Sequence, residues 1–464
     1  MTNDGALINF RFPGIILFLL LSVFVMAMVS GCGSNDKTYT ISGTVTLGGS
    51  VLSGTTVTLT GTTSRVGTTD ANGNYTFRDV PIGTYTVTPT FSGYTFSPPN
   101  RPVYLDGMDA SGFDFYGTVQ GRLLTTTHTL YLKADGTAWA WGKNNHGQLG
   151  NGTTTDSAIP GQVSGLSNVR VMSVGNTHAV VVLNDGTVWA WGENSNGQLG
   201  NGTTTDSTIP VKVSGLTNVI AVAAGYDHTV ALLNNGTVWA WGGNSHGQLG
   251  NGTTTDSAIP VQVNTVSTII AVAAGYTYSV ALMNDGTVWE WGNNVNGQLG
   301  NGTTTDSSTP LVAAISNVTA VTAGYRHVVV LLRDGRIWAW GGNGNGQLGN
   351  GTTTETATPV RIEVTGVTAV AAGYDHTVTL KKDGTVWTWG GNSQGQLGNG
   401  TTTSSLTPVQ ASGLSGIIGI TAGYINTACL KNDGTAWAWG NNSNGQLGDG
   451  TTTDRWTPVQ FHLP

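Results

Sequence analysis

The sequence predicts an all-β protein in which a seven-bladed β-propeller follows a small β-sandwich. Three observations carry this prediction. The motif Trp-x-Trp-Gly occurs seven times, at steps of 49 or 50 residues. Each copy contains short apolar segments of strand length, separated by Gly, Asn and Asp. No part of the repeated region has the 3.6-residue period of an amphipathic helix.

The chain opens with the pattern of a secretory signal, predicted over 1–31. Arg11 precedes an apolar run over 14–29, and small residues lead to Cys32. This ending resembles the lipobox of bacterial lipoproteins, which implies lipidation at Cys32 and a lipid anchor in the membrane of the bacterial cell envelope. Ordinary secretion and an uncleaved anchor are the alternatives. Gly33 after the Cys favours the outer membrane or cell surface over the inner membrane.

Residues 32–38 are expected to form a tether, and 39–117 a β-sandwich. Alternating polar and apolar residues predict strands at 39–47, 56–60, 74–77, 84–88 and 113–116. The stretch over 69–87 resembles the carboxypeptidase regulatory-like (transthyretin-like) module, which implies a stalk or spacer. Asp70, Asn72 and Asn74 could ligate calcium, but Asp-x-Asn-Gly is also ordinary turn chemistry, which we favour. Calcium or sugar binding here stays open.

The repeats predict a propeller over 118–464. In the third copy, Asn235-Gly236 is a tight-hairpin signal between two apolar segments. Four strands in each of seven repeats make seven blades. Trp239 and Trp241 lie two residues apart and face one side of the sheet, so we interpret the Trp pairs as packing between blades. The recurring Gly-Gln-Leu-Gly is interpreted as a structural clip. Ring closure stays open: the segment near 118–124 either joins the last blade or does not.

Three motifs recur in order: Gly-Tyr-x-His-Thr-x-x-Leu, Asp-Gly-x-Val-Trp-x-Trp-Gly and Gly-Gln-Leu-Gly. Together they resemble the regulator of chromosome condensation repeat, which implies a seven-bladed propeller. The family's nuclear member is a guanine-nucleotide exchange factor that uses a wedge inserted in one blade. The uniform repeat length leaves no room for one, so we do not expect exchange activity. A plant photoreceptor of this fold has Trp in the motif where this chain has Tyr, which disfavours photoreception. Those tyrosines are Tyr226, Tyr276, Tyr325, Tyr374 and Tyr424.

No catalytic constellation is visible, and we expect neither an enzyme nor a cofactor. Histidines recur at one repeat position, but sevenfold placement holds them too far apart to share a metal, so a structural hydrogen bond is the preferred role. They are His128, His178, His228, His327 and His376. Cys429 replaces a small apolar strand residue and is predicted to be a packed core thiol. A net charge of −7 without a basic stripe argues against nucleic acid.

Residues that differ between near-identical copies are the candidates for specificity. They follow Gly-Tyr and Trp-Gly, in turns where a propeller presents its binding faces. The candidate binding residues are Lys143, Glu193, Asp227, Arg326 and Asp375. We therefore predict a monomeric, non-catalytic cell-envelope lipoprotein whose propeller binds a protein or peptide. The alternative is a carbohydrate-binding surface protein, suggested by the abundance of Trp, Asn and Thr.

Overall fold

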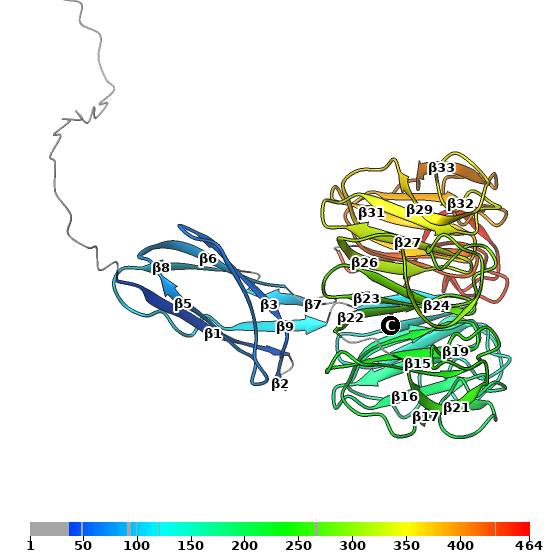
Figure 1. The fold of residues 1–464 in the computed structure, drawn as a ribbon, viewed down its shortest axis with the longest axis horizontal. Helices are drawn as coiled ribbons and strands as arrows, with labels where there is room; N and C mark the ends of the chain where they lie inside the picture. The colour runs from blue at the N-terminus through cyan, green and yellow to red at the C-terminus, as the bar shows by residue number, and fades with distance from the viewer. Residues whose placement is uncertain are drawn as a thin grey trace, which may run out of the picture.

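A computed structural model describes residues 37–47, 50–90, 94–98, 100–119, 121–264, 268–431 and 433–464. The predicted signal over 1–31, Cys32 and most of the tether lie outside these ranges. Two all-β units follow each other along the chain, a sandwich and a propeller (Figure 1). In the part of the chain so described, no helix is long and apolar enough to cross a membrane.

The sandwich consists of two sheets that enclose one core. One sheet has the order β2-β1-β9-β7, with β5 paired to the first part of β1, and the second has the order β4-β3-β6-β8. Its strands are β1 (Tyr39–Leu47), β2 (Ser50–Val51), β3 (Thr56–Gly61), β4 (Arg65–Thr68), β5 (Asn74–Val80), β6 (Gly83–Thr90), β7 (Tyr94–Ser97), β8 (Arg101–Leu105) and β9 (Phe115–Val119). Alternate residues such as Ile41, Leu59 and Tyr85 are buried between the sheets, as a period of two requires. All five predicted strands are present, whereas β2, β4, β7 and β8 were not predicted.

Each repeat forms one antiparallel sheet whose four strands follow in chain order, so the predicted seven blades are confirmed. The innermost strands are β10 (Arg122–Thr125), β14 (Val169–Val174), β18 (Val219–Ala224), β22 (Ile269–Ala274), β26 (Val318–Ala323), β30 (Val367–Ala372) and β34 (Ile417–Ala422). The second strands are β11 (His128–Leu132), β15 (His178–Leu183), β19 (His228–Leu233), β23 (Tyr278–Met283), β27 (His327–Leu332), β31 (His376–Lys381) and β35 (Asn426–Lys431).

The outer half of each blade holds the Trp pair. The third strands are β12 (Ala138–Gly142), β16 (Val188–Gly192), β20 (Val238–Gly242), β24 (Val288–Gly292), β28 (Ile337–Gly341), β32 (Val386–Gly390) and β36 (Ala436–Gly440). The outermost strands are β13 (Ser157–Gln162), β17 (Ser207–Lys212), β21 (Ser257–Gln262), β25 (Ser307–Val312), β29 (Thr356–Ile362), β33 (Ser405–Gln410) and β37 (Arg455–Phe461).

The propeller has two unlike faces. The chain passes from β9 into the start of β10, so the innermost strands begin at the face next to the sandwich (Figure 1). Because strands alternate in direction, the loops after the first and third strands of every blade all lie on the opposite face. We call this the distal face. It carries the turns after Gly-Tyr and the Gly-Gln-Leu-Gly loops.

The second Trp of each pair fills the gap between neighbouring blades. Trp241 is fully buried, and its indole Nε1 donates to the carbonyl oxygen of Gln198 in the preceding blade at 2.9 Å. The same bond recurs around the ring, for example from Trp191 to Gln148 and from Trp389 to Gln347. The first Trp, such as Trp239, is only half-buried. The prediction of inter-blade packing is therefore right for both, because Trp239 also packs against the cluster between the two blades, although it is less buried than Trp241.

Ring closure uses the same contacts without a shared strand. β37 completes the last blade and β10 belongs to the first, so segment 118–124 does not join the last blade. The clip of the last blade instead reaches the first: Trp141 Nε1 and the Thr129 hydroxyl both donate to the Gln446 carbonyl, at 3.1 and 2.7 Å. Phe461 packs edge-on against Trp141, with ring centroids 5.5 Å apart. The ring is therefore closed by packing and by the Gly-Gln-Leu-Gly loop of the last blade, which contacts the first blade.

One buried side chain breaks the pattern of the blade interfaces. Glu290 in β24 is fully buried at a position occupied by Ala in five other blades and by Thr388 in the sixth. Its Oε2 accepts a hydrogen bond from Trp340 Nε1 at 3.1 Å, while Oε1 has no partner among the described residues. Burial holds the pKa of Glu290 well above its usual range.

We expect Glu290→Ala and Glu290→Gln to raise the free energy of unfolding at pH 7, by about 1–3 kcal/mol, because each removes a poorly satisfied buried carboxyl group. The folded state holds a proton that the unfolded state releases above about pH 4.5. The contribution of Glu290 to the free energy of unfolding therefore falls as pH rises. The increase in that free energy caused by either substitution should shrink as pH decreases towards 4.5. Urea unfolding at both pH values measures the gain; a gain independent of pH would contradict the assignment.

Candidate binding face

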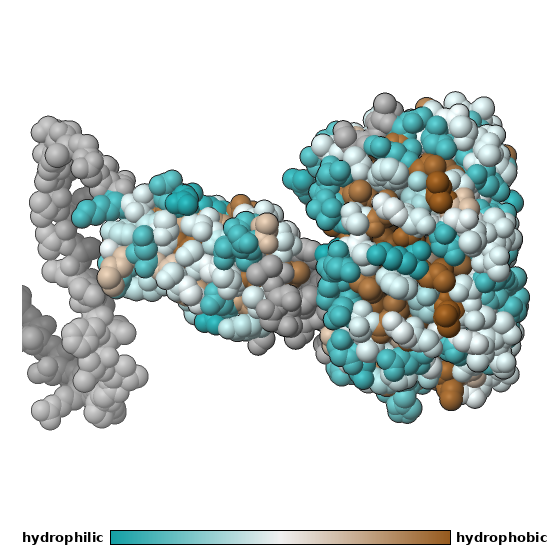
Figure 2. Space-filling view, turned by 90° about the horizontal axis from the view of Figure 1, so that it is seen from below, coloured by the Kyte–Doolittle hydropathy of each residue, from teal (hydrophilic) through white to brown (hydrophobic). Residues whose placement is uncertain are grey.

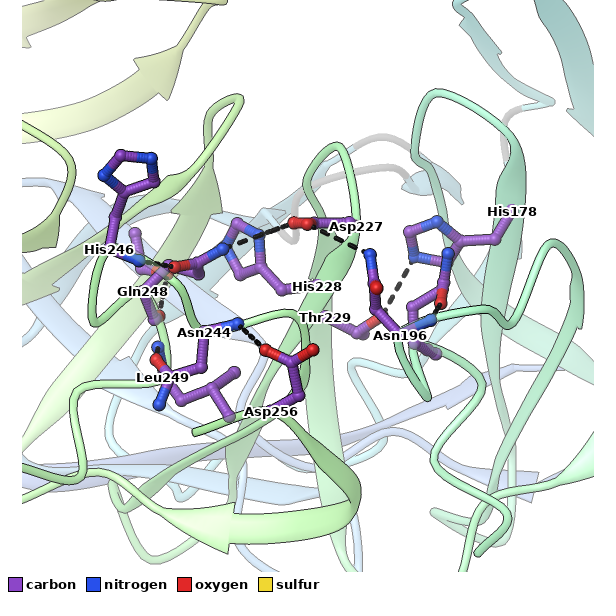
Figure 3. A network of polar contacts seen from close by, with 12 residues as sticks. His178, Asn196, Asp227, His228, Thr229, Asn244, His246, Gln248, Leu249 and Asp256 are labelled. Carbon is purple, nitrogen blue, oxygen red and sulfur yellow. Dashed lines mark hydrogen bonds and ion pairs between the residues drawn. The ribbon is translucent and has the colours of Figure 1, made fainter. Parts of the chain in front are cut away.

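Four of the five recurring histidines form a buried hydrogen-bonded belt between blades. His178 Nε2 lies 3.0 Å from the Thr229 hydroxyl of the next blade, and that hydroxyl donates to the Gln198 carbonyl at 3.1 Å (Figure 3). Because the hydroxyl proton is used there, Thr229 accepts from His178, which fixes the Nε2–H tautomer. The same relay runs from His228 to Ser279, His327 to Thr377 and His376 to Thr427.

The predicted structural bond is confirmed for these four histidines but not for His128, whose Nε2 has no partner among the described residues because Ala179 supplies no hydroxyl. Tyr278 replaces His by donating to the Gly324 and His327 carbonyls, at 3.0 and 2.7 Å, and Asn426 replaces it by donating to the Thr125 hydroxyl. Burial lowers the pKa of His228 to about 3 and that of His178 to about 4, so these imidazoles are neutral. Among the described residues, no group of three or more His, Cys, Asp or Glu could hold a metal ion.

The remaining predicted motifs also have structural roles. In the sandwich, Asp70 Oδ1 accepts the backbone N–H groups of Asn72 and Asn74, at 2.8 and 2.9 Å, which is the turn chemistry favoured over calcium. Cys429 is 1% exposed in the core between the last two blades, which confirms the predicted core thiol, and burial raises its pKa. In the loop clip, Gln198 Oε1 accepts the Asn196 backbone N–H at 3.0 Å, as predicted.

The two sets of variable turn residues are paired within each blade. The residue after Trp-Gly donates its backbone N–H to the carbonyl of the residue after Gly-Tyr, at 2.7–3.2 Å in all seven blades. The pairs are Thr127–Lys143, Thr177–Glu193, Asp227–Gly243, Thr277–Asn293, Arg326–Gly342, Asp375–Gly391 and Ile425–Asn441. A Cβ atom on Gly243 would lie 2.4 Å from the Asp227 carboxylate. A side chain at position 243 would therefore displace the Asp227 carboxylate, so the two residues of this pair fit each other.

Two of the candidate residues are half-buried carboxylates held by amides. Asp227 accepts from Asn196 Nδ2 and Gln248 Nε2, both at 3.3 Å (Figure 3). Asp375 is held in the same way, by Asn345 at 3.1 Å and by Gln396 at 3.4 Å. Burial raises the pKa of both carboxyl groups. These aspartates therefore hold the turns of neighbouring loops together.

The other three candidates lie in different blades of the same face. Arg326 is exposed, and its guanidinium lies 4.8 Å from the centroid of the Tyr325 ring, at cation–π distance. Glu193 accepts from the Thr177 and Ser195 hydroxyls, and Lys143 is half-buried beside Thr127. All five candidates therefore lie on the distal face, in five separate turns and not in one cluster.

Sequence reasoning missed the most ordered feature of the distal face. Tyrosines from five consecutive blades stand side by side around the end of the central channel, with neighbouring ring centroids 4.0–4.2 Å apart. They are Tyr226, Tyr276, Tyr325, Tyr374 and Tyr424, and we call them the tyrosine crescent. Thr126 and Asn176 occupy the equivalent positions in the other two blades and leave a gap. The recurring Gly-Tyr was the available signal, but only the ring geometry brings these residues together.

The crescent is held by backbone and side-chain contacts. The Tyr226 N–H donates to the Tyr276 carbonyl at 3.1 Å, and Tyr325 N–H to the Gly373 carbonyl at 3.1 Å. The ring of Tyr276 lies between those of Tyr226 and Tyr325, with centroids 4.2 and 4.1 Å away. Desolvation and these neighbours raise the pKa of Tyr276, so the phenols stay protonated at physiological pH.

Apolar side chains also appear on the outer rim. Figure 2 shows a row of brown patches across the side of the propeller, where β17 and β21 lie in Figure 1. Ile159, Ile209 and Ile259 in the outermost strands are 49–64% exposed. Trp456 is 53% exposed and packs beside Gly395 in the clip of the preceding blade. Exposed apolar residues spaced one per blade are ordinary on a soluble surface, so the distal face remains the stronger candidate.

Comparison with known families agrees with this architecture. The RCC1-like domain matches residues 256–464, and the regulator of chromosome condensation (RCC1) repeat matches 135–182 and 185–232. A second model of the same repeat matches 169–198 and 219–248. The carboxypeptidase regulatory-like domain matches residues 40–107.

Similar solved structures share the fold at low identity. Yeast RCC1 (Prp20), in its complex with Kap60, has a TM-score of 0.65 at 22% identity over 73% of this chain and 85% of that chain. Human WBSCR16 has a TM-score of 0.65 at 24% identity over 71% of this chain and 94% of that chain. Human E3 ubiquitin-protein ligase HERC2 is 39% identical over 49 residues, only 11% of this chain and 1% of HERC2. The chain thus carries a propeller of regulator of chromosome condensation (RCC1) repeats, preceded by a carboxypeptidase regulatory-like domain.

Proposed function

We propose that this protein is a non-catalytic lipoprotein of the bacterial cell envelope whose propeller binds a protein or peptide partner on its distal face. The observation that carries the proposal is the location of the blade-specific residues. All five candidates lie on that one face, while the second Trp of each pair and the Gln and Leu of the Gly-Gln-Leu-Gly loops, which recur in every blade, are buried in packing and hydrogen bonds. Packing that repeats from blade to blade, combined with turns that vary, is the arrangement of a scaffold that presents a binding surface.

The proposed surface combines aromatic and charged groups. The tyrosine crescent lies at its centre and Arg326 stacks on one of its rings. Tyr and Arg are the side chains most enriched in protein–protein hot spots. The charges around them differ in sign: Lys143 and Arg326 are cationic, and Glu193, Asp227 and Asp375 are anionic. Such a mixed surface selects a partner by complementary charge and not by net attraction.

The proposed anchor gives this face its orientation. Lipidation at Cys32 would place the sandwich between the membrane and the propeller, because the sandwich adjoins the face opposite to the crescent. The distal face would then point away from the membrane, where a partner can reach it. The carboxypeptidase regulatory-like domain serves as a spacer in this arrangement.

The test is affinity capture from an envelope extract with the full mature chain, made soluble by Cys32→Ser. We expect a partner recovered by the wild-type surface to be lost by at least tenfold with Arg326→Glu. The matched control is Lys382→Glu, which makes the same change of charge at an exposed residue of the opposite face. If no captured protein is recovered in different amounts by the two variants, the distal face is rejected as the binding surface.

A further inference from the structure

The centre of the propeller contains a cavity that the proposed protein-binding surface does not use. It has a volume of about 420 Å³ and extends from the middle of the innermost strands to the tyrosine crescent. All seven blades contribute to its wall, through residues such as Leu124, Met172, Val272 and Ile420. Cavities of about 300–1,000 Å³ with mostly apolar walls are typical of small-molecule sites.

The wall of this cavity carries no charged side chain among the residues that line it. Most of its polar side chains are already satisfied by the protein. Ser173 Oγ accepts the Ala224 N–H at 2.9 Å, and Thr322 Oγ1 accepts the Ala372 N–H at 3.2 Å. The Thr125 hydroxyl is bonded to Thr129 at 2.8 Å. Because a buried charge without a partner is costly, the body of any ligand here must be uncharged and mainly apolar.

The gap in the crescent supplies polar groups at the mouth. Thr126 donates its hydroxyl to the Gly175 carbonyl at 2.8 Å. The Asn176 side-chain amide lines the cavity and has no hydrogen-bond partner in the described part of the chain. An amide both donates and accepts, so Asn176 can bind a hydroxyl, a carbonyl or another amide. Five blades have Tyr at this position, and their rings contact one another.

We propose that the channel binds a small uncharged molecule with an aliphatic body and one polar end, and that Asn176 holds that end in the gap of the crescent. The apolar body lies against the Val, Ala and Ile side chains of the innermost strands. The crescent covers most of the mouth, so the ligand enters beside Asn176 and Thr126. This site is distinct from the charged turns around it.

The experiment uses the full mature chain with Cys32→Ser and the neutral fluorophore N-phenyl-1-naphthylamine, which brightens in apolar sites. We expect saturable binding, displaced by 1-decanol at least tenfold better than by decanoate or decylammonium of the same chain length. The charged competitors test the expectation that the uncharged wall of the cavity disfavours a charged ligand. Lys382→Glu, on the opposite face, is the control and should bind like the wild type.

Two variants locate the site. Asn176→Tyr completes the crescent with the residue of five other blades, so the fold should tolerate it, and we expect decanol to bind at least fivefold more weakly. Ala273→Phe fills the channel and should abolish binding, with near-ultraviolet circular dichroism as the check of folding. Absence of saturable binding, equal binding of charged and neutral competitors, or no effect of Asn176→Tyr would each overturn the proposal. None of these outcomes depends on the protein partner of the distal face.

Discussion

Trp241→Ala should cost about 3–5 kcal/mol of stability, whereas Trp239→Ala should cost less than half as much. The two residues lie in the same strand and face the same side of one blade. Trp241 is fully buried against the preceding blade and donates to the Gln198 carbonyl, while Trp239 is half-buried. Removal of the Trp241 indole leaves a cavity between two blades, next to Gly200, where the backbone packs so closely that a Cβ would lie 2.6 Å from the indole Nε1.

Urea unfolding of the two variants measures the difference as a shift of the midpoint at constant slope. Because the substitutions are identical in chemistry and two residues apart, each is the control for the other. Equal losses would mean that both indoles contribute alike and that the clip is not what joins the blades. A loss confined to Trp241 would support the same role for Trp141 at ring closure, where the geometry of the bond to Gln446 is the same.

Most of the fold follows from the sequence because its determinants are local or periodic. The seven blades were predictable from the Trp-x-Trp-Gly spacing, and the hairpins from Asn235-Gly236 and its equivalents. The structural role of the histidines followed from the fact that Tyr278 and Asn426 replace them. Ring closure was not predictable, because Gln446 and Trp141 are at opposite ends of the repeats and the sequence does not show which blade each strand joins.

The candidate site was predictable only in part. Variation among the copies pointed to Asp227, Arg326 and Asp375, but not to the close packing of Asp227 and Asp375 on Gly243 and Gly391 in the facing turns. The tyrosine crescent was missed because its members are 49 or 50 residues apart in the sequence and become neighbours only where the innermost strands converge. The signal lay in Thr126 and Asn176, the two copies that lack Tyr. Because the tyrosine recurs in five blades, the sequence alone suggested that it belongs to the repeated structural framework and not to a surface feature.

The largest pH effect should come from the buried histidines. Five are fully buried, with pKa values lowered to about 3 or 4 by burial, while in the unfolded chain they titrate near 6.5. Between these values the unfolded state binds protons that the folded state does not, so stability must fall as pH decreases below 6.5. At pH 5 the loss is about 2 kcal/mol for each histidine, on the scale of 1.4 kcal/mol for each pKa unit.

We therefore expect the free energy of unfolding to fall steeply from pH 7 to pH 5. Surface carboxylates do not explain such a loss, because a group such as Asp433, with a pKa lowered to about 2, loses its contribution only below about pH 4. Glu290 opposes the trend, because its raised pKa makes the folded state gain stability as pH falls.

The decisive variant is His327→Asn, which copies the residue found in the last blade and removes one buried base. Its unfolding free energy should fall by about 2 kcal/mol less between pH 7 and pH 5 than that of the wild type, whatever the two values are at pH 7. Parallel curves for the two proteins would show that His327 does not titrate in this range on unfolding, and the belt would then be no source of acid sensitivity.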